Sequence, residues 1–267
     1  YSLGEACGEI TNMLQDFHHP KAKRVFDWDI AQAGWTYPYQ NLFGKEEKEC
    51  IIYFTEAFER IQLQFQSFRK SVVHNDANDN NIIVSNNLVN PKVETIIDFG
   101  DSAYTQTIND LAVAIAYGVM DQADPLAAAL LIIAGYHEKF PLLDEELKAL
   151  YVLTAMRLVL SVTKSAINIK KEPGNVYLQI SDKQAWALLF KWKNIPPALA
   201  YYSFRSACGM IPVPNEIIFK EQVATNDFSL TGLFPTLPYQ KIQSPDLRIG
   251  SLFLGNFSSY QNTRKFS

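Results

Sequence analysis

The sequence has 267 residues, of which 48% are hydrophobic, 13% aromatic and 19% charged. These fractions are typical of a folded globular protein, and they exclude intrinsic disorder, a collagen-like repeat and a coiled coil as the main architecture. The 24 basic and 28 acidic side chains give a formal charge of -4, so the chain has no general attraction for nucleic acid or for an anionic membrane. We expect neither as a partner, and the length predicts one large domain or one domain with an appendage.

The cysteines and the start of the chain bear on the setting of the protein. Cys7, Cys50 and Cys208 are far apart and match neither a disulfide framework nor a CxxC metal site, which predicts a reducing, cytoplasmic compartment. The longest apolar run, residues 126–134, has about half the length that a membrane-spanning helix needs. The chain lacks a starting Met and any signal-peptide pattern, and it opens within a helical pattern. We therefore expect it to be a piece of a longer polypeptide.

The order of elements predicts an α+β protein that is mostly helical. A first helix should end before Pro20, and an irregular segment rich in aromatic rings should follow it. Short β-branched runs at 71–74, 81–85 and 93–97 predict strands. We assign 1–210 to the helical body and 211–267 to a C-terminal extension or a linker toward a following domain. The apolar periodicity predicts helices over 45–69, 106–120, 125–140, 144–169, 176–192 and 196–208.

Candidate catalytic residues lie where the predicted strands end. His74, Asp76 and Asn81 match the pattern HxDxxxxN, and Asp98 opens a DFG triplet directly after an apolar strand. A carboxylate such as Asp76 can orient an attacking hydroxyl and accept its proton. The amide oxygen of Asn81 and the carboxylate of Asp98 are ligands that Mg²⁺ prefers. The alternative is an Asx-rich turn between strands, which explains neither His74 nor the strand before the triplet.

The segments VVHNDANDNNIIV and ETIIDFGD resemble those of the aminoglycoside phosphotransferase and choline kinase superfamily. HHPKAKRVFDWDI and IDFGDSAYTQTINDLAVAIAYGVM are similar to segments of hydroxylysine kinase-like domains, including those fused in bacteria to class III aminotransferases. The resemblance covers roughly residues 1–210 and implies the C-terminal lobe of a protein-kinase-like fold. It also implies transfer of the γ-phosphate of ATP or GTP, with Mg²⁺, to a hydroxyl of a small amine or amino acid, with a hydroxylysine-like acceptor favoured.

The resemblance also implies roles for individual residues. Asp76 would be the catalytic base, Asn81 and Asp98 the metal ligands, and His74 a residue that braces the loop. Asp110 would support the catalytic loop from the following helix. For Asp101 two roles stay open, contact with the metal or with the amine of the substrate.

One expected part of the family is absent from the sequence. We find no glycine-rich phosphate loop and no VAIK-like strand before the catalytic motif, so the amino-terminal lobe should precede residue 1. Such a fragment would by itself be weakly active or inactive, and further domains of the same polypeptide are expected partners. A catalytically silent kinase fold that acts as a binding module is the alternative function. A metal-dependent hydrolase built on His74 and Asp76 would need more histidines nearby than the four in the chain supply.

Other polar and aromatic residues have two interpretations each. His18 and His19 are expected in a loop or cap rather than at a metal. Arg157 and Lys164, seven residues apart on one helix, could hold a carboxylate beside the cleft or form a surface stripe. The rings at Trp28, Trp35, Tyr37 and Tyr39 are expected in the core rather than in a substrate pocket.

Overall fold

The computed structural model describes residues 1–87, 89–171 and 176–214, and for residues 176–182 it describes the backbone alone. The chain divides into two compact units, Tyr1–Pro196 and Pro197–Ser267. The second unit contributes one described helix, α7 (Pro197–Ala207). The expected boundary near residue 210 stays a prediction, and nearly all of the expected extension lies outside the described residues.

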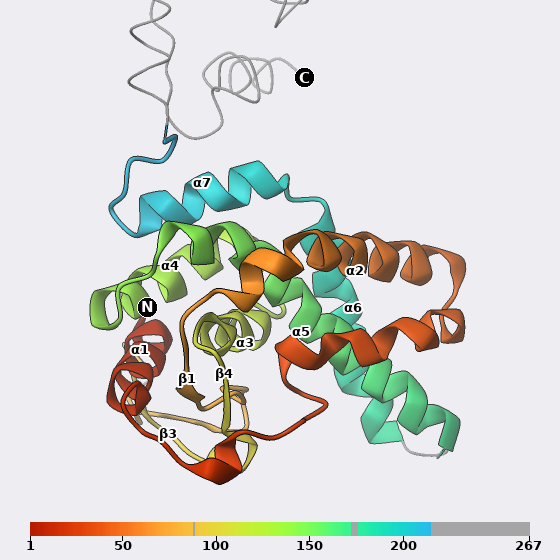
Figure 1. Cartoon of the computed structure of the whole chain (residues 1–267), viewed down its shortest axis with the longest axis horizontal. Coiled ribbons are helices and arrows are strands. Elements are labelled where there is room, and N and C mark those ends of the chain that lie inside the picture. Colours follow the sequence, from red (N-terminus) through yellow and green to blue (C-terminus); the bar gives the residue numbers. More distant parts are fainter. Residues whose placement is uncertain (88, 172–175, 215–267) are drawn as a thin grey trace, which may run out of the picture. The chain divides into compact units, whose positions relative to one another are not determined.

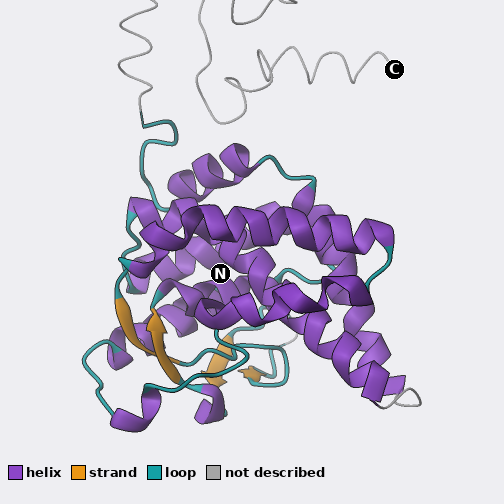
Figure 2. Cartoon of the chain, turned by 45° about the vertical axis from the view of Figure 1, so that its right-hand side comes forward, coloured by secondary structure: helices purple, strands orange, loops and turns teal. Residues whose placement is uncertain are grey.

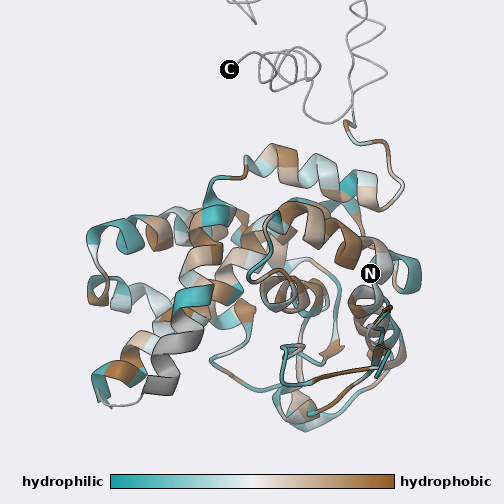
Figure 3. Cartoon of the chain, turned by 180° about the vertical axis from the view of Figure 1, so that it is seen from behind, coloured by the Kyte–Doolittle hydropathy of each residue, from teal (hydrophilic) through white to brown (hydrophobic). Residues whose placement is uncertain are grey.

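The first unit is mostly helical, as the sequence predicts (Figure 1). Its centre is α3, in which every residue from Ile108 to Ala116 is buried. Around α3 pack α1, α4 and α5, and apolar residues gather on these inner helices in Figure 3. The helices are α1 (Ser2–Leu14), α2 (Lys45–Gln66), α3 (Ile108–Gly118), α4 (Pro125–Lys139), α5 (Asp144–Lys171) and α6 (Val176–Lys193).

The helix α5 is the main packing partner of the unit. It contacts α2, α3, α6 and the 3₁₀ segment η2 (Ile30–Leu42). By length and composition α5 could cross a membrane, but 72% of its most apolar window is buried within the protein, as in a core helix. It nevertheless carries Arg157 in the middle of this buried stretch, and that arginine belongs to the site described below.

The helices α1 and α4 approach each other at backbone distance because glycines face the contact. A Cβ atom at Gly4 would lie 1.9 Å from the carbonyl oxygen of Ile132, and one at Gly135 would lie 2.4 Å from the carbonyl oxygen of Tyr1. Real Cβ atoms do not approach other heavy atoms so closely, so both positions require glycine. The close contact holds α1 tightly against α4.

Two small antiparallel sheets lie together at one end of the unit (Figure 2). In one, β1 (Lys70–Val73) pairs with β4 (Ala103–Gln106), so that Val73 lies opposite Ala103. In the other, β2 (Ile82–Val84) pairs with β3 (Val93–Ile96), so that Ile82 lies opposite Ile96. The three expected strands are confirmed, whereas β4 was not predicted.

The segment between α1 and α2 differs from the expectation. Two 3₁₀ segments, η1 (Pro20–Ala22) and η2, occupy part of the region that we expected to be irregular. Its most deeply buried apolar side chains are Ile30 and Ala33, while Tyr39 is 40% exposed. The prediction that this segment packs by burying its rings was therefore wrong in part: Trp28, Trp35 and Tyr37 are half-buried, and the fully buried apolar side chains of the segment are small or aliphatic.

Candidate active site

The loop that follows β1 is held in place by His74. Its Nδ1 accepts a hydrogen bond from the backbone N–H of Asp76 at 3.2 Å. A ring nitrogen that accepts carries no proton, so the proton is on Nε2, which donates to the carbonyl oxygen of Ile97 at 3.0 Å. His74 thus ties the loop to the end of β3, which is the bracing contact that we expected.

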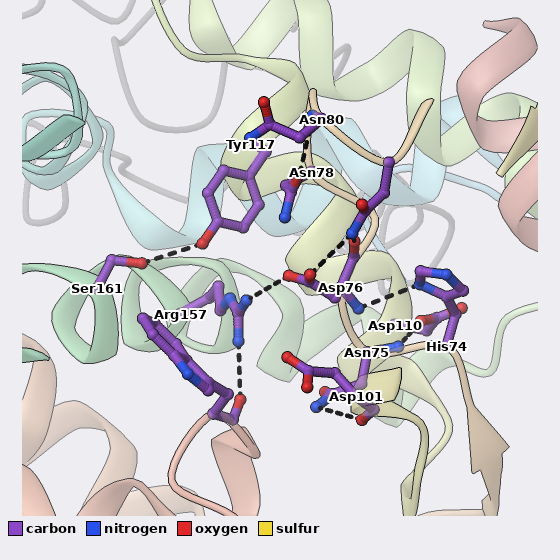
Figure 4. Close-up of polar contacts among 12 residues, drawn as sticks. His74, Asn75, Asp76, Asn78, Asn80, Asp101, Asp110, Tyr117, Arg157 and Ser161 are labelled. Carbon is purple, nitrogen blue, oxygen red and sulfur yellow. Dashed lines mark hydrogen bonds and ion pairs between the residues drawn. The ribbon is translucent and has the colours of Figure 1, made fainter. Parts of the chain in front are cut away.

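The Asp76 carboxylate is held at both oxygens. Its Oδ1 accepts from Nη2 of Arg157 at 3.0 Å, and its Oδ2 accepts from Nδ2 of Asn81 at 2.8 Å. The same Asn81 nitrogen lies 2.9 Å from the Asp76 carbonyl oxygen. The side chain of Asp76 is 19% exposed, so it is fixed in orientation and still reaches solvent. Figure 4 shows Asp76 between His74 and Arg157.

Asn81 and Asp98 lie at the same end of the β2–β3 hairpin. The backbone N–H of Ile97 donates to the carbonyl oxygen of Asn81 at 2.9 Å, and Asp98 is the next residue. Asp98 has a left-handed backbone (φ 64°), and its Oδ1 accepts from the N–H of Gly100 at 3.0 Å. The structure therefore brings Asp76 and Asn81 into direct contact and places Asp98 beside the strand partner of Asn81.

These residues fit a magnesium ion. Because Nδ2 of Asn81 points at Asp76, its Oδ1 stays available, and among the described residues no donor bonds to it. The Asp98 carboxylate keeps its second oxygen. Mg²⁺ takes few protein oxygens and completes its shell with phosphate and water, so a larger cluster is not required. Within the described ranges, no group of three or more His, Cys, Asp or Glu could hold a metal.

Asp110 supports the loop from the start of α3. It is 1% exposed, and its Oδ1 accepts from the backbone N–H of Asn75 at 2.8 Å. Its Oδ2 accepts from Oγ1 of Thr11 at 3.2 Å, and that hydroxyl accepts from Tyr136 at 3.0 Å. Burial raises the pKa of Asp110, against the opposing hydrogen bond from Asn75. Asn75 has a left-handed backbone (φ 67°) between His74 and Asp76, so this bond holds the loop at the residue with the strained backbone.

Asp101 is the third carboxylate of the region. Burial raises the pKa of Asp101, and the neighbouring charge of Asp76 raises it further, while Arg157 and Arg24 lower it. Its backbone carbonyl accepts a weak bond from Asn75 at 3.4 Å, and among the described residues its carboxylate accepts no hydrogen bond. In Figure 4 its side chain extends toward the Asp76–Arg157 pair.

Arg157 and Lys164 both pair with carboxylates of this chain. Arg157 binds Asp76, so it belongs to the site rather than to a surface stripe. Lys164 pairs with Asp27 and lies 5.1 Å from the ring centre of Trp35. The signal that could have identified Arg157 is its place in an otherwise apolar run of a long helix. His19 caps η1 by accepting from the N–H of Lys21, as expected of a loop histidine.

A helical body with two polar loops at the end of a small hairpin defines a protein with a kinase-like fold. The chain belongs to the phosphotransferase enzyme family, whose model matches residues 1–145. This membership confirms the expected superfamily. The same fold occurs in the solved structure of a microcompartment-associated aminopropanol kinase, with a TM-score of 0.51 and 17% identity, over 77% of this chain and 62% of that one.

Two curated relatives are similar in sequence. The chain is 28% identical over 199 residues to a hydroxylysine kinase of Mus musculus, across 70% of this chain and 53% of that protein. It is 29% identical over 201 residues to a hydroxylysine kinase of Xenopus laevis, across 70% of this chain and 54% of that protein. The chain thus spans about half the length of the curated relatives that it matches.

Proposed function

We propose that the protein is a small-molecule kinase that transfers the γ-phosphoryl group of ATP or GTP to a hydroxyl group of a small amine or amino acid. The observation that carries the proposal is the Asp76 carboxylate, which is held at both oxygens next to Asn81 at the end of the β2–β3 hairpin. The similarity to hydroxylysine kinases supports an acceptor with both a hydroxyl and an amino group.

Asp76 acts on the acceptor hydroxyl. Its fixed carboxylate accepts a hydrogen bond from the hydroxyl and takes the proton as the hydroxyl oxygen bonds to the γ-phosphorus. The bond from this phosphorus to the bridging oxygen breaks, and the nucleoside diphosphate leaves. Mg²⁺, when bound, neutralises charge on the phosphates, and Asn81 Oδ1 and Asp98 are the residues that would hold it.

The described residues correspond, in this proposal, to the larger helical lobe of the kinase fold. Exposed apolar side chains lie along β2 and just after β3, where a nucleotide base could pack. They are Ile83, Val84, Ile97 and Phe99, each between 42% and 54% exposed. The greater length of the relatives supports a nucleotide site that is completed by residues of the full protein outside the described ranges. The three free cysteines support a reducing compartment such as the cytoplasm.

The test is a turnover assay of the full-length protein. ATP and GTP are each offered with a panel of amino alcohols and hydroxy amino acids, and release of nucleoside diphosphate is measured. We expect acceptor-dependent release that Asp76→Asn lowers by about 100- to 10,000-fold, the usual contribution of a general base.

The matched control is Asp79→Asn, which removes an exposed carboxylate from the same loop and should leave the rate unchanged. A rate for Asp76→Asn equal to that of the control would contradict the role of Asp76. Nucleotide binding without acceptor-dependent release for any member of the panel would instead favour the binding module.

A further inference from the structure

A buried arginine contacts the proposed catalytic carboxylate from α5. The side chain of Arg157 is 2% exposed, and its two terminal nitrogens donate to different partners. Nη2 donates to Oδ1 of Asp76 at 3.0 Å, and Nη1 donates to the carbonyl oxygen of Trp28 at 2.9 Å. The guanidinium carbon lies 4.8 Å from the ring centre of Trp28 and 5.4 Å from that of Tyr117. Its position is therefore set by three separate segments of the chain.

We propose that Arg157 is a positioning residue for phosphoryl transfer, which holds Asp76 in the orientation that accepts the acceptor hydroxyl. This inference rests on the proposed function, because it gives Asp76 the part of the base. Arg157 touches neither reactant in this scheme and acts only through Asp76.

The geometry shows why the arginine is needed. Asn81 alone would leave Oδ1 of Asp76 unrestrained, and Asn81 also has to present its own oxygen to a metal. A planar guanidinium has donors in a fixed fork, so it can bind a carboxylate and a carbonyl at once without bending. With one donor on each oxygen, rotation of the carboxylate about its Cβ–Cγ bond would break both contacts. The lone pairs of the Asp76 carboxylate that are not used in these contacts then keep one direction, in which they can accept the hydroxyl group of the acceptor.

The carbonyl group that binds Nη1 of Arg157 is itself held in place. Trp28 precedes Asp29, which is 3% exposed and accepts from the backbone N–H of Ala31 and from Oγ1 of Thr105 at 2.8 Å. Asp29 also accepts from Nδ2 of Asn109 at 3.3 Å. The contacts of Asp29 with β4 and α3 thereby hold the neighbouring Trp28 carbonyl in place. Arg157 binds this carbonyl and Asp76 at the same time, so its own position relative to Asp76 is fixed.

A purely structural arginine of the same kind occurs elsewhere in the chain. Arg69 donates to both oxygens of the buried Glu146, at 2.9 and 2.6 Å, and to the carbonyl oxygen of Pro141 at 2.9 Å. Its guanidinium carbon lies 4.5 Å from the ring centre of Phe140. It thus has a carboxylate, a carbonyl and a ring as partners, like Arg157, but none of them belongs to the site. Arg69 is the matched control for the loss of such contacts.

The experiment measures steady-state kinetics and urea unfolding of the full-length protein with Arg157→Met, Arg157→Lys and Arg69→Met. We expect Arg157→Met to lower kcat by about 100-fold, since misplacing a catalytic group by about 1 Å costs that much, while KM for the nucleotide stays within about twofold. Arg157→Lys keeps the charge without the fork and should lose about tenfold. Adding methylguanidinium should restore part of kcat to Arg157→Met and none to Arg69→Met. The control should unfold at lower urea with kcat unchanged.

Two results would overturn the inference. The first is a kcat of folded Arg157→Met within about threefold of wild type, and the second is a fall in kcat no larger than that of Arg69→Met at equal loss of stability. If Arg157→Met does not fold, Arg157→Lys is compared with the wild-type protein instead. A kcat of Arg157→Lys equal to that of the wild type would also refute the inference. Failure of the proposed function is separate, because it appears as a lack of acceptor-dependent release in the wild-type protein, and failure of the role of Asp76 appears as an unaltered rate in Asp76→Asn.

Discussion

Replacing Asp110 by Ala should disorder the loop that carries the proposed base. The substitution removes the acceptors of the Asn75 backbone N–H at 2.8 Å and of the Thr11 hydroxyl at 3.2 Å. A buried donor left without a partner costs about 1–3 kcal/mol, and the strained left-handed backbone of Asn75 loses the contact that holds it. We therefore expect a loss of about 3 kcal/mol in the free energy of unfolding, which is more than about 100-fold in the folding equilibrium.

The assay combines urea unfolding, followed by tryptophan fluorescence, with hydrogen exchange at the Asn75 amide. Asp110→Ala should unfold at lower urea with an unchanged slope, and the Asn75 amide should lose its protection. Asp110→Asn is the control, because its amide oxygen can still accept from the Asn75 N–H, and it should lose only about 1 kcal/mol. An Asp110→Ala protein with the wild-type midpoint and a protected Asn75 amide would refute the reasoning.

Four further changes have expected results. Asp101→Asn should raise KM for amine-bearing acceptors about tenfold in steady-state kinetics, as loss of a charged hydrogen bond would, and leave KM for the nucleotide unchanged. Asp98→Asn should weaken nucleotide binding with Mg²⁺ but strengthen it in the presence of a chelator, because a carboxylate repels phosphate; titration calorimetry checks both signs. Burial raises the pKa of Asp29, so the folded protein binds the proton of this carboxyl more tightly than the unfolded chain does. The resulting stabilisation is fully present below about pH 4, the pKa of an unfolded Asp, and is lost as the pH rises through the raised pKa of the folded state. Asp29→Asn cannot ionise, and its unfolding free energy relative to wild type should increase from about pH 4 to pH 7 in urea titrations. Gly4→Ala should lower the thermal midpoint by about 10 °C or more, since its Cβ would lie 1.9 Å from a backbone oxygen of α4.

The parts of the site that are local in sequence could be predicted. His74, Asp76 and Asn81 lie within one loop, and Asp98 follows a strand whose apolar run ends just before it. Alternation and turn residues identify such strand ends, and a hairpin then brings the two loops together. The helices could be predicted for a similar reason, because each extends over enough turns for its apolar period to be distinct.

The long-range contacts could not be predicted. Arg157 and Asp76 are 81 residues apart, and periodicity gives the face on which Arg157 lies but not the element opposite it. The bond from Thr11 to Asp110 spans 99 residues and depends on how α1 packs near α3. The strand β4 was missed because its four residues, AYTQ, are too few for a pattern of their own. They are extended because β1 offers them a partner.

The charges around the loops affect how a nucleotide and an amine would bind at the proposed site. Burial raises the pKa of Asp101, and the negative charges of Asp76 and Asp98 raise it further, despite opposition from Arg157 and Arg24. Arg157 is already engaged by Asp76, and Arg24 donates to the carbonyl oxygen of Gly100 at 2.8 Å. Apart from the Asp76–Arg157 pair, the two carboxylates of Asp98 and Asp101 face one cation, Arg24, so a triphosphate that approached alone would be repelled. A divalent ion at Asp98 would remove that repulsion on one side, and an ammonium group at Asp101 would remove it on the other. Arg157 already compensates the charge of Asp76, so the negative charges left for the reactants to balance are those of Asp98 and Asp101.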